Sequence, residues 1–350
     1  MELALYHPEF GYYARAGQRS GRAGDFFTSV DVGAVFGELL EAQCAEMFRL
    51  LESSESANSR TRNPDAGFDL VEAGAGNGRL SADMLRAARA THPEFYRAIR
   101  LHLVEASPAA RADQHATLGD VVDRLVSSSD ALPDSFEGVL VANELLDAMP
   151  VHQVTMTEDG LKEVYVNAQL STLIAPPSTP RLQEYLDRVG VRLQPGWRVE
   201  VNLHAVDWIR SAARRLGRGF IVLVDYGHEA RELYSASHSA GTLTTFSGHR
   251  AGDGDAWLQR PGEQDITSHV DWTSVRAAAE AEGMQTIAFL DQTYFVLGLL
   301  SSLRDPQSAL RKIKTLLMPG GLGSTMKVLI LGKGVGTPQL LGTSFKVRAT

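Results

Sequence analysis

The sequence predicts an α/β fold in which a mainly parallel sheet is covered by helices on both faces. From Phe68 onward, short apolar segments alternate with amphipathic ones, as in parallel strands joined by helical crossovers. The clearest corner is F-D-L-V-E-A-G-A-G-N-G-R-L, residues 68–80, where an apolar run ends in an acid and opens into three alternating glycines. A strand, a glycine-rich turn and a helix in this order suit a nucleotide, because glycines admit the ligand to the backbone and the helix start offers free N–H groups.

Composition narrows the class of protein. The 350 residues are 44% hydrophobic and 22% charged, which suits one large α/β core with an insertion or two closely joined domains. No apolar run approaches the roughly 20 residues of a membrane span, and the N-terminus lacks a secretion signal, so we expect a cytoplasmic protein without an integral membrane segment. The net charge of -8 argues against a nucleic-acid partner. The single cysteine, Cys44, cannot form an internal disulfide and is expected to be buried.

The N-terminal part begins with aromatic and turn residues, L-Y-H-P-E-F-G-Y-Y, that leave little room for a full helix. Apolar residues at three- and four-residue steps then predict a long helix over Val32–Leu51. A surface loop rich in Ser, Asn, Arg and Pro follows at Glu52–Gly67. The core alternation comes next, and its segments are L-V-E-A-G, L-S-A-D-M-L-R-A-A-R-A, R-L-H-L-V-E-A, S-P-A-A-R-A-D-Q-H-A-T-L and G-V-L-V-A-N-E.

An inserted hairpin interrupts this alternation, because residues 151–167 alternate around a Glu-Asp-Gly turn. A Pro/Ser/Thr loop follows at 171–181. The strands W-R-V-E-V-N and G-F-I-V-L-V-D-Y-G then resume the core, with a helix at 205–216 between them. After an irregular stretch at 231–268, a helix at 271–282 leads to the strand T-I-A-F-L, a helical stretch and the final strand M-K-V-L-I-L.

These elements divide the chain into four parts. We expect an N-terminal, helical substrate-side segment (1–51), a first part of the core (68–152), a β-rich inserted substrate segment (153–200) and the remainder of the core (201–334), which carries its own insertion at about 230–268.

The glycine turn also discriminates between nucleotides. Dinucleotide-binding enzymes need G-x-G-x-x-G/A, but counting from Gly74 places Arg79 at the last position, and counting from Gly76 places Ser81 there. This disfavours an NAD-dependent dehydrogenase. The remaining pattern, acid-x-G-x-G-x-G with Glu72 at the strand end, resembles motif I of the seven-stranded S-adenosylmethionine (SAM) methyltransferases. In those enzymes the acid helps to hold the cationic methionine end of the cofactor, and the glycines admit it.

Two further acids are candidates for contacts with adenosine. Glu105 ends R-L-H-L-V-E-A, where an acid can accept hydrogen bonds from both hydroxyls of a ribose. Dehydrogenases use the same arrangement, so Glu105 supports adenosine binding without selecting the cofactor. Asp130, in S-S-S-D-A-L-P before the next predicted strand, could approach the adenine, although such clusters are usually only turns.

Polar residues crowd the segment after the strand G-V-L-V-A, which reads N-E-L-L-D-A-M-P-V-H. Acids and amides at the mouth of a pocket are costly unless they face ligands or partners. We therefore take Glu144 and Asp147 as catalytic candidates and Asn143 as a cofactor contact; the alternative is that Asn143 caps a helix and Asp147 is solvated. Asp225, in V-D-Y-G at the end of another core strand, is a third catalytic candidate on the substrate side.

Histidines give no sequence signal for a metal. His152, His228 and His249 do not show the spacing of a metal site, and isolated histidines are more often core or surface residues. We therefore expect no metal.

Several longer strings together resemble the MidA family, namely G-D-F-F-T-S…V-F-G-E-L-L, E-A-G-A-G-N-G, A-N-E-L-L-D-A-M-P-V-H, V-D-Y-G, G-T-L…G-H-R and P-G-E-Q-D-I-T-S-H-V-D-W. Its members are SAM-dependent methyltransferases, and the mitochondrial branch is a complex I assembly factor that methylates an arginine of a complex I subunit. The resemblance runs from Leu5 to about Gly334. It implies a class I, Rossmann-like seven-stranded sheet with inserted substrate-covering segments, and cofactor roles for Glu72, Gly74, Gly76, Gly78 and Glu105. Thr28, in G-D-F-F-T-S, is a further candidate cofactor contact.

The resemblance also implies a protein substrate, a subunit of the respiratory NADH dehydrogenase, with arginine as the methyl acceptor. A guanidinium stays protonated at physiological pH, so carboxylates must orient it. Glu144 with Asp147 or Asp225 could orient this group and take the released proton. Two alternatives stay open: a small-molecule methyltransferase, and a non-catalytic SAM-binding assembly factor. The oligomeric state is open as well, a homodimer included.

Overall fold

The computed structural model describes residues 1–14, 25, 28–58, 67–248, 250–252, 254–303, 305–317 and 326–345. The chain forms two compact units. The first, here called the sheet unit, comprises Thr28–Glu144, Ala212–Asp225 and Glu282–Thr350, and the second unit comprises Met1–Phe27, Leu145–Ser211 and Tyr226–Ala281. The chain thus leaves the sheet unit after Glu144 and first re-enters it at Ala212, whereas the sequence suggested boundaries near residues 152 and 201.

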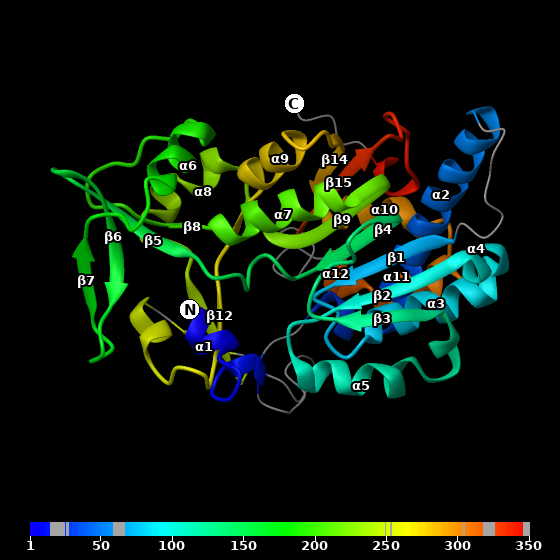
Figure 1. Ribbon diagram of the computed structural model, residues 1–350, viewed down its shortest axis with the longest axis horizontal. Helices are drawn as coiled ribbons and strands as arrows, with labels where there is room; N and C mark the ends of the chain where they lie inside the picture. The colour runs from blue at the N-terminus through cyan, green and yellow to red at the C-terminus, as the bar shows by residue number, and fades with distance from the viewer. Residues whose placement is uncertain are drawn as a thin grey trace. The chain divides into compact units, whose positions relative to one another are not determined.

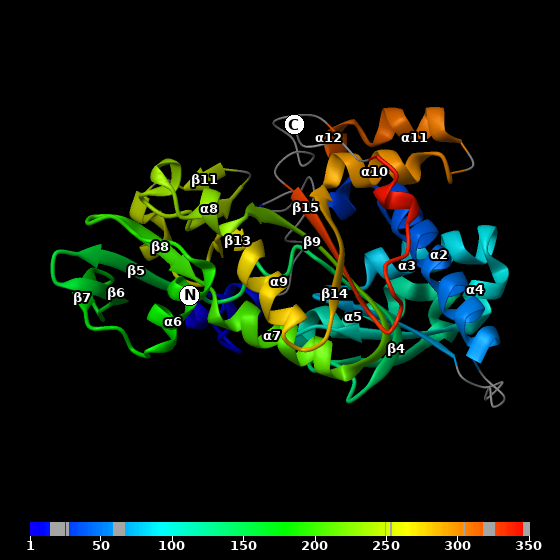
Figure 2. The same cartoon turned by 90° about the horizontal axis from the view of Figure 1, so that it is seen from above.

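A mainly parallel sheet forms the centre of the sheet unit (Figures 1 and 2). Its strand order is β14-β15-β9-β4-β1-β2-β3. The pairs β1–β2, β1–β4, β2–β3 and β4–β9 are parallel, and β14 runs antiparallel to β15. The strands are β1 (Phe68–Ala73), β2 (Ile99–Val104), β3 (Leu125–Ser129), β4 (Phe136–Asn143), β9 (Leu216–His228), β14 (Gln285–Asp291) and β15 (Met326–Lys333). This topology confirms the predicted α/β fold of the class I type.

Several helices of the sheet unit contact the strands directly: α2 contacts β4, α5 contacts β3, and α10 contacts β14 and β15. In α3, Leu80, Met84, Leu85 and Ala88 are buried, and α2 also contacts α3. The helices of the sheet unit are α2 (Ala34–Asn58), α3 (Arg79–Thr91), α4 (Pro93–Ala98), α5 (Pro108–Leu118), α10 (Gln292–Leu300), α11 (Pro306–Lys312) and α12 (Lys314–Leu317), with the 3₁₀ turns η2 (Ser29–Val32), η3 (Gly119–Arg124) and η6 (Leu341–Thr343). α7 (Leu203–Arg215) runs from the second unit into the sheet unit.

Two sequence expectations for the sheet unit were wrong. Helix α2 continues to Asn58, past the expected start of a loop at Glu52, because E-S-S-E-S-A contains no Gly or Pro that would end a helix. Residues 59–66 of the expected loop lie outside the described residues. The serine-rich segment L-V-S-S-S forms strand β3, which the sequence reading missed. Asp130 therefore directly follows a strand of the parallel sheet.

The second unit is built around a four-stranded antiparallel sheet with the order β7-β6-β5-β8. Its strands are β5 (His152–Thr157), β6 (Gly160–Val166), β7 (Thr172–Ala175) and β8 (Arg198–Val201). The pairing of β5 with β6 confirms the predicted hairpin. Two expectations are corrected: W-R-V-E-V-N forms β8, which pairs with β5 instead of joining the parallel core, and β7 lies within the expected loop at 171–181.

The stretch expected to be irregular at 231–268 contains a second small sheet. Its order is β11-β10-β12, with β10 (Thr244–Ser247), β11 (Arg250–Gly252) and β12 (Asp265–Thr267). These strands are short and rich in Thr, Ser and Gly, so their periodicity was not recognisable. The remaining elements of this unit are α1 (Glu2–Tyr6), α6 (Arg181–Val189), α8 (Ala230–Leu233), α9 (Trp272–Glu280), β13 (Val270–Asp271), η1 (Tyr12–Ala14), η4 (Ala236–His238) and η5 (Gly254–Leu258).

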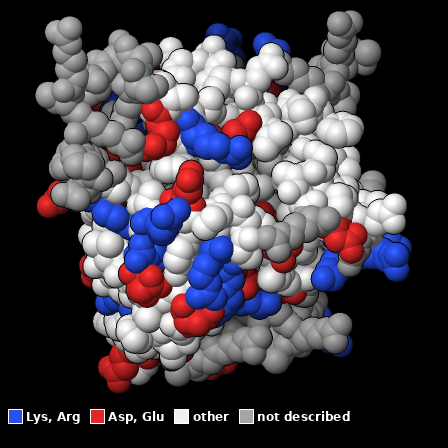
Figure 3. Space-filling view, turned by 90° about the vertical axis from the view of Figure 1, so that its right-hand side faces the viewer, with Lys and Arg blue, Asp and Glu red and all other residues white. Residues whose placement is uncertain are grey.

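Charges of both signs are interspersed on the face drawn in Figure 3. The ion pairs of the sheet unit include those of Arg86 and Arg89 with Asp120. The described part of that face is therefore mixed in sign. Among the helices described, none combines the length and the apolar character that crossing a membrane requires.

Candidate active site

The glycine turn after β1 adopts a backbone that only glycine accepts readily. Gly74, Gly76 and Gly78 have φ values of 73°, 50° and 83°, in the left-handed region. The N–H groups of Gly74 and Ala75 both donate to the carbonyl of Val104, at 2.9 and 3.1 Å, which ties the turn to the end of β2. An added Cβ at Gly76 would meet no atom within 4 Å, so this side of the turn is open to a ligand.

Glu105, the residue after β2, is bonded to the same turn. Its Oε2 accepts a 2.8 Å hydrogen bond from the N–H of Gly76, and its Oε1 accepts one of 2.8 Å from Ser107. Gln114 of α5 donates to the carbonyl of Gly76 at 2.8 Å, so that carbonyl is also fixed. A carboxylate has about four acceptor positions, and those left over can receive ribose hydroxyls.

Glu72 lies at the end of β1, buried against the start of α3. Its Oε2 accepts hydrogen bonds from the backbone N–H of Ser81, at 3.1 Å, and from the Ser81 hydroxyl. Burial raises the pKa of Glu72 to about 7, and the charge of Glu105 adds to this rise, whereas the hydrogen bonds from Ser81 oppose it. The predicted contact of Glu72 with the methionine end of SAM stays a prediction.

Two other predicted cofactor residues lie around this corner in the sheet unit. Thr28 donates from its N–H and its hydroxyl to Oδ2 of Asp31, at 3.0 and 2.9 Å, and Asp31 pairs with Arg79 of α3 at 3.2 Å. Thr28 is therefore linked to the helix that follows the glycine turn. Asp130 is exposed at the end of β3, one strand beyond Glu105. Phe26, Phe27 and Gly24 of the G-D-F-F-T-S string lie outside the described residues.

The end of β4 carries a strained acid. Glu144 has φ 51°, which costs about 1–2 kcal/mol in a residue with a Cβ. Its N–H donates to the carbonyl of Val224 in β9 at 2.8 Å, and its Oε1 accepts from the N–H of Ser29 at 2.9 Å and from the Asn143 amide at 3.1 Å. Strain of this kind is typical of functional positions, where the surroundings hold a side chain in a required direction.

An adenosyl ligand with a cationic amino-acid end fits the residues present. Oδ1 of Asn143 is buried and accepts no hydrogen bond from the described residues, so it offers an acceptor to an ammonium group. On the open side of Gly76 a ligand can approach the backbone closely, and Glu105 offers hydrogen-bond acceptors to the ribose. All three lie in the sheet unit, at the carboxyl ends of β1, β2 and β4, where α/β folds bind ligands.

The three catalytic candidates are divided between the units. Asp225 is buried in β9 of the sheet unit, next to Val224, which accepts from Glu144. Asp147 belongs to the second unit, where the Tyr226 hydroxyl donates to its Oδ2 at 2.6 Å and its carbonyl accepts from Ser268 at 3.0 Å. Burial raises the pKa of Asp147 to about 6, although the hydrogen bond from Tyr226 lowers it.

Tyrosines of the second unit surround Asp147, and the sequence reading missed them. The Tyr6 hydroxyl donates to the carbonyl of Ala148 at 2.9 Å, and the Tyr13 hydroxyl donates to Oδ1 of Asp265 at 2.9 Å. Burial raises the pKa of Tyr13, and the charges of Asp265 and Asp147 contribute to this rise. The aromatic N-terminal string contained the signal, but nothing in the sequence indicated which acids it would meet.

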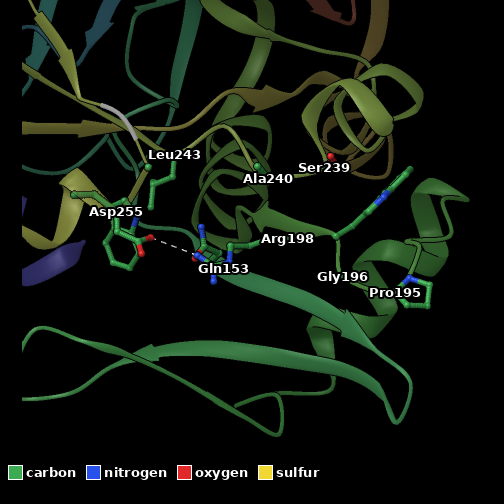
Figure 4. Close-up of a pocket in the computed structure, with 11 residues that line it drawn as sticks. Gln153, Pro195, Gly196, Arg198, Ser239, Ala240, Leu243 and Asp255 are labelled. Carbon is green, nitrogen blue, oxygen red and sulfur yellow. Dashed lines mark hydrogen bonds and ion pairs between the residues drawn. The ribbon is translucent and has the colours of Figure 1, made fainter.

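A separate cavity of about 590 Å³ lies in the second unit (Figure 4). Gln153 of β5 and Arg198 of β8 line it, and Arg198 lies 3.5 Å from Asp255, which also lines it. None of the predicted site residues lines this cavity. His249, rejected as a metal ligand from its spacing, lies outside the described residues.

Comparison with known proteins identifies the family of this chain. Residues 39–290 match the model of the family described as "Putative S-adenosyl-L-methionine-dependent methyltransferase". The chain belongs to this methyltransferase family. It is 27% identical to mouse mitochondrial protein arginine methyltransferase NDUFAF7, over 99% of this chain and 78% of the mouse protein, and 28% identical to the zebrafish protein of the same name, over 80% and 67%.

A solved structure supports the same family assignment. The methyltransferase resembles a protein of Burkholderia thailandensis whose crystal structure contains S-adenosyl-homocysteine, with a TM-score of 0.83, 28% identity and coverage of 99% of this chain and 90% of the other. The protein is therefore a SAM-dependent methyltransferase, which confirms the predicted activity and cofactor. When bound, SAM supplies a methyl group on a sulfonium. The residues that would hold it are the glycine turn, Glu105 and Asn143, and Glu144 lies beside Asn143.

Proposed function

We propose that this methyltransferase transfers its methyl group to an arginine of a protein. The observation that carries the proposal is the hydrogen bond from the Glu144 N–H to the carbonyl of Val224, because it holds one acid at the end of β4 beside the strand that carries another, Asp225. Both lie in the sheet unit, as the cofactor turn does. The relatives from mouse and zebrafish are named protein arginine methyltransferases, which supports the same acceptor.

The chemistry of arginine explains why acids are needed. The guanidinium is planar, keeps its proton at physiological pH and spreads its charge over three nitrogens. A carboxylate can bind two of its N–H groups side by side, which leaves the third nitrogen to face the methyl group in line with the departing sulfur. The nitrogen must also lose a proton to an acceptor. We assign the orienting role to Glu144 and Asp225.

Asp147 is the candidate proton acceptor. Its carboxyl is buried beside Tyr226, and its pKa of about 6 keeps it ionised at neutral pH while leaving it basic enough to take a proton. This assignment rests on its chemistry within the second unit.

The test compares Glu144→Gln and Asp225→Asn with Glu94→Gln, which changes an exposed acid on α4. SAM binding is measured by calorimetry, and methyl transfer is measured with labelled SAM and a lysate of cells lacking the gene. We expect both site variants to bind SAM normally and to methylate about 100-fold more slowly, and Glu94→Gln to match the wild type. Normal rates in both site variants would remove these acids from the mechanism.

The identity of the labelled species tests the acceptor and the partner. By resemblance, we propose a subunit of the respiratory NADH dehydrogenase as the substrate, labelled on arginine. Label on a small molecule would instead establish the first alternative. Tight SAM binding without transfer to any lysate component would establish the second, a non-catalytic assembly factor.

A further inference from the structure

Three histidines meet in the second unit, outside the acids and the cofactor turn. His228 ends β9, His238 ends η4, and His269 lies between β12 and β13. One ligand atom from each lies within 4.8 Å of the other two, and their ring centroids are 4.8, 5.2 and 6.0 Å apart. The histidines are 10 and 31 residues apart in sequence, so no local spacing reveals the cluster.

Glu232 contacts two of these rings, and its backbone carbonyl orients the ring of His238 as a metal ligand requires. Its Oε1 lies 3.1 Å from Nδ1 of His228, and its backbone carbonyl lies 3.0 Å from Nδ1 of His238. An imidazole that donates from Nδ1 keeps its lone pair on Nε2, the atom that then binds a metal. A carboxylate or carbonyl behind the histidine is the usual outer partner of such ligands.

The third ring contributes an unsatisfied nitrogen. Nδ1 of His269 is buried and has no hydrogen-bond partner in the described part of the chain, a situation that buried polar atoms rarely tolerate without a water or an ion. The backbone fixes this residue, because its N–H donates to the Thr242 hydroxyl at 3.1 Å. The following residue, Val270, pairs with Gly227 of β9, which keeps His269 beside His228.

We propose that His228, His238 and His269 together bind one divalent transition-metal ion of the zinc type. Imidazole nitrogen suits zinc, copper, cobalt and nickel. Ligand nitrogens about 2.0–2.1 Å from a tetrahedral ion are roughly 3.4 Å apart, so modest ring rotations from the present separation complete the set. Three protein ligands leave a fourth position for solvent. The ion links the end of β9 to η4 and to the segment before β13.

Metal binding to the full-length protein tests this assignment. Protein stripped with a chelator and dialysed is loaded with Zn²⁺ for elemental analysis, and with Co²⁺ for its visible absorption. We expect about one ion per chain, a tetrahedral Co²⁺ spectrum, and a melting temperature that rises on adding Zn²⁺. His238→Gln and His269→Gln should lose all three responses, whereas His204→Gln, at an exposed histidine of the same unit, should keep them.

A variant of Glu232 distinguishes the histidines that bind the ion from the residue that contacts them. Glu232→Gln should bind the ion about tenfold more weakly while keeping one ion per chain at saturation. The melting temperatures of the metal-free variants show whether each still folds. The proposal is overturned if the wild type takes up no Zn²⁺ at micromolar concentration, or if folded His238→Gln and His269→Gln both retain the wild-type stoichiometry.

Discussion

The backbone N–H of Gly76 donates a 2.8 Å hydrogen bond to Oε2 of Glu105. This bond joins the turn after β1 to the acid after β2, two elements that the sheet already holds in register through Ala73 and Val104. The hydrogen bond and the sheet register together fix the turn and the acid relative to each other, and a fixed site lowers the ordering cost of binding.

Removing the charge of this acid should weaken cofactor binding. A hydrogen bond to a charged group contributes about 1.5–3 kcal/mol, so we expect Glu105→Gln to raise the SAM dissociation constant at least about tenfold. Calorimetric titration measures it, with Glu94→Gln as the control. An unchanged affinity would mean that Glu105 does not contact the ribose.

The open side of the turn gives a second prediction. Gly76→Ala and Gly160→Ala both place a Cβ at positive φ with no atom within 4 Å, so each should lose about 1–2 kcal/mol of unfolding free energy. Only Gly76→Ala adds its methyl where the ligand approaches, and its SAM affinity should fall at least about tenfold relative to Gly160→Ala. Equal affinities in these two variants would place the ligand elsewhere.

Glu72 should make stability depend on pH. Its folded pKa of about 7 lies above its ordinary value of 4.5, so the stability it contributes is present below about pH 4.5 and is lost as pH rises through about 7. The shift corresponds to about 3 kcal/mol. Chemical unfolding without cofactor at pH 4.5 and 8 should show Glu72→Gln gaining up to that amount on the wild type as pH rises. A constant difference between the two proteins would show that Glu72 is not shifted.

The raised pKa of Asp147 predicts how the turnover number depends on pH on the acidic side. If its carboxylate accepts the proton, the turnover number should fall as pH drops through about 6, and Asp147→Asn should abolish turnover or remove this limb.

Tyr226 should determine the pH at which the turnover number falls on the acidic side. The hydrogen bond from Tyr226 lowers the pKa of Asp147, so Tyr226→Phe should move the acidic limb to higher pH. Tyr165→Phe removes a comparable bond to Glu163 in the same unit and should leave the limb in place. A limb that shifts equally in both variants would dissociate it from Asp147.

The parts of the fold that local chemistry dictates were predictable. The local sequence of residues 68–80 determines their structure. It contains an apolar strand that is buried throughout and three glycines that adopt left-handed backbone conformations. Strand β3 and the small sheet of β10 to β12 were not recognised, because short strands of Ser, Thr and Gly lack an apolar period.

The positions of the candidate site residues were predictable only at the ends of strands. Asn143 is the last residue of β4, whereas Glu105 and Glu144 directly follow β2 and β4. Parallel pairing brings such strand ends to one edge of the sheet. The contact of Tyr226 with Asp147 spans 79 residues, and the pairing of Tyr13 with Asp265 spans 252. Neither follows from periodicity or a motif, since each depends on how the second unit folds.

A crystal structure with S-adenosyl-homocysteine would show where the cofactor binds. We predict ribose hydroxyls within hydrogen-bond distance of Glu105, the amino-acid end beside Asn143, and the ligand against the open side of Gly76. A ligand bound away from the turn, or a turn closed over by side chains with Glu105 still bonded only to Gly76 and Ser107, would contradict the account.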